Sequence, residues 1–154
     1  MLPTRREGQS GVRADVLKVV IRWFVEEVLN TGNLKAVDEL FAPDYIAHVP
    51  LDPEPVRGAV AWKQRLTTYL AAFPDLHVTL EDLVAEKDIV VARLTWSGTQ
   101  RELFLGVSAT NRRVAVAGMY AWRIADGKMC EEWIAEDLLS LMQQLGALPK
   151  RLPS

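Results

Sequence analysis

The sequence of 154 residues has few side chains that bind metals or form disulfides. It contains one cysteine, Cys130, and two histidines, His48 and His77. A single cysteine excludes an intrachain disulfide and a cysteine-based zinc site, and two distant histidines do not indicate a metal centre. We therefore expect no metal, and we interpret Cys130 as a packed side chain.

Long apolar runs and blocks of one charge are also absent. No stretch of about 18 apolar residues occurs, so no membrane span is expected. The N-terminus has no apolar core of signal-peptide length, which makes the cytoplasm the default location. The 18 basic and 20 acidic residues give a formal net charge of −2 and are spread along the chain. This distribution does not predict nucleic-acid binding.

The composition is sufficient for one folded domain, because 49% of the residues are hydrophobic. We expect a flexible leader at 1–11, a single domain at 12–149 and a C-terminal tail at 150–154. The sequence has no internal repeat, and it has no serine elbow, phosphate-binding loop or dinucleotide fingerprint.

The first half of the chain predicts helices. Apolar residues at helical spacing predict a first helix, and Thr31-Gly32 is expected to end it. Asn33 is the expected cap of a second, short helix that ends before Pro43. A short strand at 44–49 and a proline-rich loop at 50–55 precede a third helix, which runs from Gly58 to Pro74. The stripe on the first helix consists of Val12, Val16, Val19, Val20, Trp23, Phe24 and Val28.

The second half predicts strands, because apolar and polar residues alternate from Leu76 to Leu80 and from Val90 to Trp96. A loop at 98–111 follows, and Asp126-Gly127 is a strong turn signal between two further strands. Three helices followed by about four long antiparallel strands indicate an α+β fold. We expect a curved, cone-shaped sheet packed on three N-terminal helices, with an apolar pocket between the layers.

Several segments, in this order and spacing, resemble the SnoaL-like polyketide cyclase (ester cyclase) family of the nuclear-transport-factor-like superfamily, which includes the ketosteroid isomerases. The resemblance covers about nine-tenths of the chain. The matching segments are Asn30-Thr31-Gly32-Asn33-Leu34, residues 40–48, Phe73-Pro74-Asp75-Leu76, Trp96-Ser97-Gly98-Thr99, Phe104-Leu105-Gly106, residues 126–137 and Gln144-Leu145-Gly146.

The resemblance implies a cone-shaped α+β barrel that forms a homodimer or tetramer across its sheet and uses no metal or organic cofactor. Cyclases of this family close a ring by an intramolecular aldol condensation, with one aspartate as acid and base. Asp137 matches that aspartate, and His48 matches a histidine that commonly faces the same pocket. Gln100 and Glu102 replace a histidine and a glycine that often follow the Trp-x-Gly-Thr segment, so the proton partner of Asp137 can differ here.

Asp137 has two interpretations. Desolvation in an apolar pocket raises the pKa of a carboxyl from about 4 toward neutrality, which suits a general base. The alternative is that Asp137 caps the helix that begins at Leu138. Strand alternation places Asp137 on one face with Glu131 and Trp133, and Glu132, Ile134 and Glu136 on the other. We interpret the glutamates as solvated or interface charges.

His48 is the expected partner of Asp137, because an imidazole titrates near physiological pH, although a backbone-bonded histidine is an equal alternative. His77 is expected on the solvent face. The side chains of Arg93 and Arg123 are also expected to face solvent. Large aromatic residues are expected to form a wall for a planar substrate. The predicted substrate-binding residues are Trp133, Tyr120, Trp96, Phe104, Trp62 and Tyr45.

The sequence thus predicts a cofactor-independent enzyme that performs acid–base ring closure on a small apolar or aromatic substrate. The first alternative is a non-catalytic ligand-binding or dimerisation module of the same fold. The second is a cofactor-free hydrolase, isomerase or hydroxylase, which would need further carboxylates or amides in the pocket. The sequence names neither the substrate nor the oligomeric state.

Overall fold

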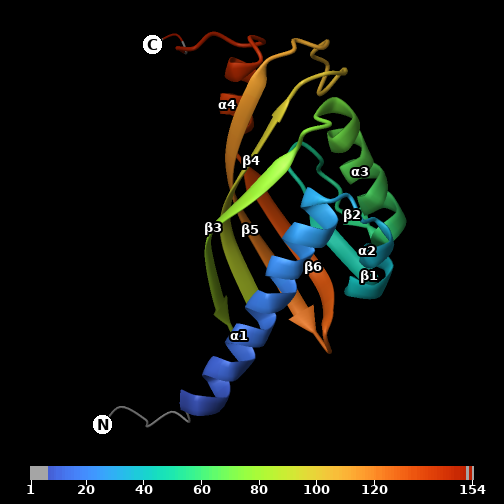
Figure 1. The fold of residues 1–154 in the computed structure, drawn as a ribbon, viewed down its shortest axis with the longest axis vertical. Coiled ribbons are helices and arrows are strands. Elements are labelled where there is room, and N and C mark those ends of the chain that lie inside the picture. Colours follow the sequence, from blue (N-terminus) through green and yellow to red (C-terminus); the bar gives the residue numbers. More distant parts are fainter. Residues whose placement is uncertain (1–6, 152, 154) are drawn as a thin grey trace.

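The protein is described by a computed structural model that covers residues 7–151 and 153. Its centre is a curved, unclosed six-stranded sheet with the strand order β2-β1-β6-β5-β4-β3 (Figure 1). The four long strands β3 to β6 pair antiparallel with one another in sequence order, as the sequence predicts. The strands are β1 (Phe41–His48), β2 (Val56–Arg57), β3 (His77–Glu86), β4 (Ile89–Thr99), β5 (Arg113–Ala125) and β6 (Lys128–Glu136).

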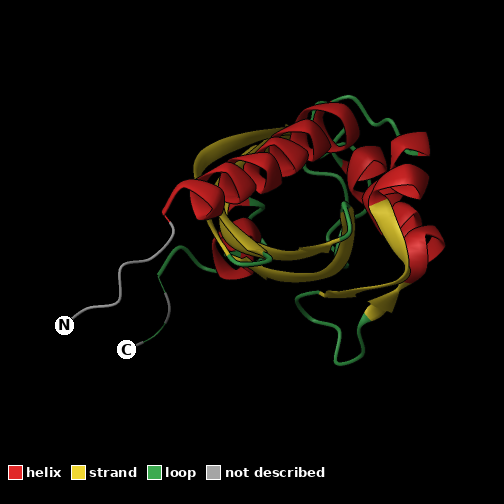
Figure 2. Cartoon of the chain, turned by 90° about the horizontal axis from the view of Figure 1, so that it is seen from below, coloured by secondary structure: helices red, strands yellow, loops and turns green. Residues whose placement is uncertain are grey.

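The helices before β3 pack on one side of this sheet. α1 lies against β3 and β4, and α3 lies against β1 and β2. Figure 2 shows the sheet as a trough with α1 across its open side. Within the described residues, no helix is long and apolar enough to cross a membrane. The helices are α1 (Glu7–Trp23), the π-helix η1 (Phe24–Asn30), α2 (Lys35–Leu40), α3 (Gly58–Ala72) and α4 (Leu138–Gln144).

The first helix differs in detail from the sequence prediction. It begins at Glu7, inside the expected leader, of which residues 1–6 lie outside the described part. The predicted apolar stripe divides between two faces, because Val12, Val16, Val19 and Trp23 are exposed. The core face consists of Leu17, Ile21, Phe24, Val25 and Val28.

Two local predictions near α2 and β1 also need correction. Gly32, at φ 74°, ends the first helical segment as expected, but Asn33 does not cap α2: its N-cap is Leu34, which has no side-chain capping bond. β1 begins at Phe41, pairs in parallel with β6, and pairs antiparallel with the short β2. The sheet is therefore mixed at this edge.

A register shift in the last hairpin determines which side chains of β6 face the helices. Arg123 pairs with Glu131, whereas Ile124 pairs with Met129, so Cys130 is the extra residue of a bulge. Met129 lies before this shift and Glu132 lies after it, and both side chains are buried. The two residues differ by three positions, so regular alternation would have placed them on opposite faces of the strand. Beyond the bulge, the inward side chains are Glu132, Ile134 and Glu136.

Candidate active site

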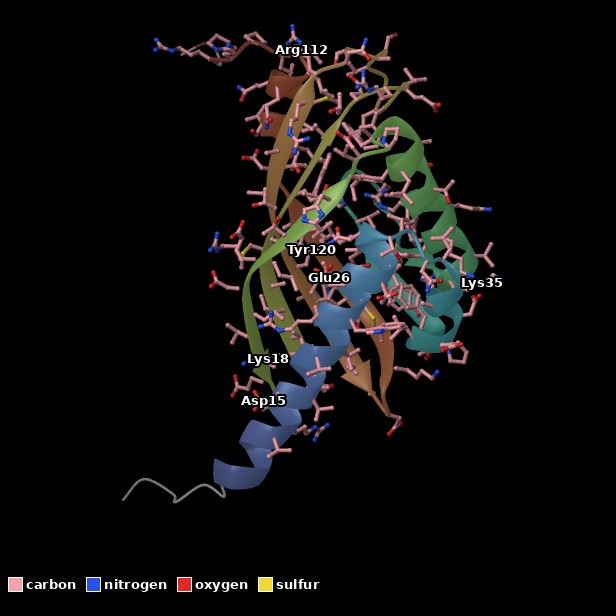
Figure 3. All side chains as sticks on the ribbon, in the orientation of Figure 1. Asp15, Lys18, Glu26, Lys35, Arg112 and Tyr120 are labelled. Atoms are coloured by element: carbon pink, nitrogen blue, oxygen red, sulfur yellow. The ribbon has the colours of Figure 1, made fainter. Side chains whose placement is uncertain are left out.

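A cavity of about 80 Å³ lies between the concave face of the sheet and the helices. Most of its wall is apolar or aromatic, and its ionisable groups are Glu132, Glu136, Arg65, Tyr69 and Tyr120. Tyr120, labelled in Figure 3, lies in the middle of the body on β5. The other lining residues are Leu29, Trp62, Leu66, Leu76, Val78, Leu94, Trp96, Trp122 and Ile134.

Glu136 is the carboxylate at one end of this cavity. The Tyr120 hydroxyl donates a hydrogen bond to Oε1, and the Tyr69 hydroxyl donates to Oε2 at 3.4 Å. Burial raises the pKa of Glu136 above the ordinary glutamate value, although the hydrogen bond from Tyr120 and the charge of Arg65 oppose the shift. Glu136 therefore holds its proton more tightly than an exposed glutamate, which is the property a general acid–base needs.

Two neighbours complete the surroundings of Glu136. Trp96 is buried, and its indole N–H has no hydrogen-bond partner within the described part of the chain. Gly118 pairs directly with Glu136 across the hairpin. A Cβ at Gly118 would lie 2.6 Å from Cε2 of Tyr120, so the glycine leaves room for the tyrosine ring beside the carboxylate.

Glu132 is buried deeper and its oxygens are fully engaged. Tyr45 donates to Oε2 at 2.6 Å, Trp62 donates to Oε2 at 2.9 Å, and Trp122 donates to Oε1 at 2.9 Å. Burial raises the pKa of Glu132 even though all three donors favour its ionised form. Because its oxygens are held by three donors from three elements, we interpret Glu132 as an organising group of the site.

Arg65 and Tyr69, one helical turn apart on α3, lie at the outer end of the cavity. Nη2 of Arg65 donates to the Tyr69 hydroxyl at 3.2 Å, and its guanidinium carbon lies 5.3 Å from the Tyr69 ring centroid. Burial raises the pKa of Tyr69 far above its ordinary value, so the phenol stays protonated and can donate to Glu136. Arg65, Tyr69 and Glu136 thus form a hydrogen-bonded chain.

Asp137 does not face the cavity. The prediction that Asp137 and His48 face one pocket is therefore wrong. It is exposed and caps α4, with Oδ1 accepting from the backbone N–H of Ser140 at 2.9 Å. This geometry is the alternative that its position before Leu138 indicated. The carboxylates that face the cavity are the two glutamates that the sequence interpretation assigned to solvent or an interface.

His48 lies on the opposite, convex side of the sheet. Its side chain is 42% exposed, its Nε2 lies 2.9 Å from Oε1 of Glu131, and its ring stacks on Trp133. His48 and Trp133 are register partners in the parallel pair of β1 and β6, which explains their contact. The expected meeting of His48 with a catalytic carboxylate in one pocket is therefore contradicted.

The structure separates the predicted substrate-binding residues into groups. Trp62, Trp96 and Tyr120 line the cavity, whereas Tyr45 is buried behind it against Glu132. Phe104 lines a second cavity at the outer end, and Trp133 lies outside. His77 is exposed, and Arg93 and Arg123 pair with exposed or half-buried acids, as their strand positions suggested.

Gln100 supports a loop and does not line the cavity. Its amide accepts from the N–H of Thr110 at 3.1 Å and donates to the carbonyls of Glu102 and Val107. In the same loop, Asn111 has a left-handed backbone, at φ 57°. Within the described part of the chain, no group of three or more acidic, histidine or cysteine side chains is arranged to hold a metal ion.

The raised pKa of Glu136 has a consequence for stability. The folded state binds this proton more tightly than the unfolded state, so stability falls as pH rises from about 4.3 through the pKa of the folded protein. Glu136→Gln cannot ionise, and we expect its free energy of unfolding to improve relative to that of the wild type over this range. Urea denaturation of both proteins from pH 4 to pH 8 measures the difference. A difference that does not change with pH would contradict the assignment.

Comparisons with known proteins identify the family of the chain. The sequence model of the SnoaL-like polyketide cyclases matches residues 19–145, which is most of the chain. The chain belongs to the SnoaL-like polyketide cyclase family. A search of curated proteins gave no significant match for this SnoaL-like protein.

Solved structures of similar proteins have the same fold. TsrD from Streptomyces laurentii is 31% identical, with a TM-score of 0.74, and the match covers 94% of this chain and 100% of TsrD. IdmH from Streptomyces antibioticus, a proposed polyketide cyclase, is 30% identical with a TM-score of 0.75 over 84% of this chain and 98% of IdmH. AclR from Streptomyces galilaeus, a proposed hydroxylase, is 27% identical with a TM-score of 0.79 over 88% and 99% of the respective chains.

Proposed function

We propose that this SnoaL-like protein is an acid–base enzyme that closes a ring in a largely apolar, carbonyl-containing substrate by an intramolecular aldol reaction. The observation that supports this most strongly is Glu136, a carboxyl with a raised pKa that faces an apolar cavity beside the hydroxyls of Tyr120 and Tyr69. Family membership and the similarity to IdmH point to the same class of chemistry.

In the proposed reaction, the Glu136 carboxylate removes a proton from a carbon next to a carbonyl and becomes a carboxylic acid. The resulting enolate carbon attacks a second carbonyl of the same molecule, and a carbon–carbon bond forms while that carbonyl oxygen becomes an alkoxide. The alkoxide takes the proton back from Glu136. The unpaired N–H of Trp96 is a nearby donor for the oxygen that gains charge, and the hydroxyls of Tyr120 and Tyr69 hold the Glu136 carboxylate by donating to it.

Deuterium exchange tests the first step without knowledge of the natural substrate. An aryl β-keto ester in D2O has a C–H bond of the required acidity, and NMR follows its exchange. We expect wild-type protein to accelerate exchange above the buffer rate, and the acceleration to be lost when an apolar competitor fills the cavity. A wild-type rate equal to that of buffer with a panel of such esters would count against the proposal.

A hydroxylase is the second candidate, because AclR is a proposed hydroxylase with similar structure. Substrate conversion in sealed vessels with and without oxygen separates the two. Conversion that needs oxygen and adds an oxygen atom to the product would favour the hydroxylase, and an isomeric product formed without oxygen would favour the cyclase.

We also propose that the protein self-associates through the convex face of the sheet. This face carries a small hollow lined mainly by apolar residues, and one of these residues, Met119, is 51% exposed. A charge at this position would have to be desolvated in an interface. We therefore expect the wild type to be a dimer or tetramer by light scattering and Met119→Glu to be monomeric. A monomeric wild type would contradict this proposal.

A further inference from the structure

A second, larger cavity of about 400 Å³ lies outside the first. It is lined by residues of the 50–56 segment, the 103–106 loop, α3 and the start of α4. Arg65 and Tyr69 line both cavities, so they form the junction between them. The other residues of the outer cavity are Pro50, Leu51, Asp52, Val56, Thr68, Leu103, Phe104, Leu105, Gly106 and Leu138.

The volumes indicate how a ligand is divided between the cavities. Ligand sites usually have about 300–1,000 Å³, and the inner cavity has only about 80 Å³. The inner cavity therefore accommodates the reacting part of a molecule but not a ring system of several rings. The bulk of such a ligand has to lie in the outer cavity, beyond Arg65 and Tyr69.

Leucines at the rim of the outer cavity have an unfavourable backbone conformation or are exposed to solvent. Leu51 and Leu105 have positive φ angles of 67° and 47°, a conformation that is uncommon for a residue with a bulky side chain. Leu51, Leu103 and Leu105 are nevertheless exposed, at 74%, 66% and 42%. Exposed leucines on a strained backbone around a hollow are expected where an apolar ligand covers them.

Arg65 supplies a cation at the junction. It takes part in none of the ion pairs found among the described residues, and its side-chain hydrogen bond goes to the Tyr69 hydroxyl. The acidic groups that line the same cavities are Glu132 and Glu136 on the inner side and Asp52 on the outer side. A half-buried guanidinium without a carboxylate partner is suited to bind an anionic oxygen of a ligand.

We propose that the outer cavity is a second compartment of the site, which binds the apolar body of the ligand, and that Arg65 binds an anionic oxygen of that ligand, such as a carboxylate or enolate. This inference rests on the proposed function, because it gives the substrate class for the chemistry at Glu136. The Tyr69 hydroxyl joins Arg65 to Glu136, so an oxygen held by Arg65 places the neighbouring carbon close to the proton-transferring group.

Calorimetric titration with two unreactive probes tests the proposal. Naphthalene-2-carboxylate and naphthalene-2-carboxamide have nearly the same shape, but only the first is charged. We expect the wild type to bind the carboxylate about tenfold more tightly or better, because hydrogen bonds to charged groups are stronger than neutral ones. Arg65→Gln should abolish this preference, and Arg65→Lys should keep part of it because it retains the charge without the planar fork.

Two further variants separate the contributions. Arg93→Gln changes an exposed arginine on β4 that pairs with Asp82, and it should keep the wild-type preference. Leu103→Ser removes an exposed side chain of the outer cavity and should weaken both probes by a similar factor. Unchanged affinity in Leu103→Ser would overturn the role of the outer cavity.

Three results would overturn the role of Arg65: equal affinity of the wild type for both probes, no binding of either probe, or a full preference for the carboxylate in a folded Arg65→Gln. Should Arg65→Gln not fold, an undiminished preference in Arg65→Lys would count in the same way. These measurements do not depend on turnover. If the probe titration fails but deuterium exchange is accelerated, the proposed function of Glu136 is kept and the role of Arg65 is rejected. If exchange is not accelerated but the probes bind as expected, the binding site is kept and the proposed function is rejected.

Discussion

Glu136→Gln is expected to lower kcat/KM for deuterium exchange or ring closure by about 10²–10⁴-fold, the usual contribution of a positioned acid–base group. The glutamine is nearly the same size and its carbonyl oxygen can still accept the Tyr120 hydrogen bond, so the cavity should keep its shape. The loss should therefore fall on the proton transfer. Steady-state kinetics with the deuterium-exchange substrate measures it.

Asp137→Asn is the matched control, because it makes the same chemical change one residue further along the chain. Asparagine caps helices about as well as aspartate, so the hydrogen bond to Ser140 and the stability should survive. We expect activity within about twofold of the wild type, since this carboxylate is exposed outside the cavity. A large loss in Asp137→Asn with little change in Glu136→Gln would reverse the assignment and return the role to the residue favoured by the family resemblance.

Glu132→Leu is expected to lower the free energy of unfolding by about 3–5 kcal/mol, because three buried donors lose their acceptor and each unsatisfied donor costs about 1–3 kcal/mol. Leucine has a similar volume but accepts no hydrogen bond. The hydroxyl of Tyr45 and the indole N–H groups of Trp62 and Trp122 would then be buried without their acceptor, and each such loss is costly. Urea denaturation followed by circular dichroism provides the measurement.

Glu131→Leu is the control for this change, because Glu131 is the adjacent residue on the opposite face. Its ion partners are His48 and Arg123, and its side chain is 25% exposed. A partly exposed pair of this kind contributes about 1 kcal/mol or less, so the control should be close to the wild type. Similar losses in both variants would show that Glu132 is not the special organising residue that its three hydrogen bonds indicate.

Much of the fold could be predicted because each signal was local. Asp126-Gly127 predicts the β5–β6 hairpin, alternation predicts β3 and β4, and Pro74 marks the end of the region that contains α3. β2 and the parallel pairing of β1 with β6 could not be predicted in this way. A two-residue strand has almost no pattern, and the β1–β6 pair joins segments more than eighty positions apart.

The site was harder to predict because one register shift determines which side chains of β6 face the cavity. Alternation along β6 correctly separates Glu132, Ile134 and Glu136 from Glu131 and Trp133. It does not say which set faces inward, and the apolar Met129 and Trp133 at odd positions favour the wrong set. The bulge at Cys130 reverses which residues of β6 face inward, and no residue type in the sequence predicts this bulge.

The signal that could have found the glutamates lies in the neighbouring strand. Tyr120 and Trp122 alternate on β5, and their register partners are Ile134 and Glu132. Aromatic residues with a polar atom usually find a hydrogen-bond partner when they are buried, so this pair predicts an acceptor on the same face of β6. Arg65 had a weaker signal, because a charged residue on a helix is ordinarily solvated.

The most direct test of the account is the titration of the Glu136 carboxyl itself, measured by 13C NMR on protein with labelled glutamate and assigned with Glu136→Gln. The account predicts that the pKa of Glu136 lies above the ordinary glutamate value, and that deuterium exchange by the same sample rises with pH through that pKa. A Glu136 that titrates like an exposed glutamate, or an exchange rate that does not follow its ionisation, would contradict the account.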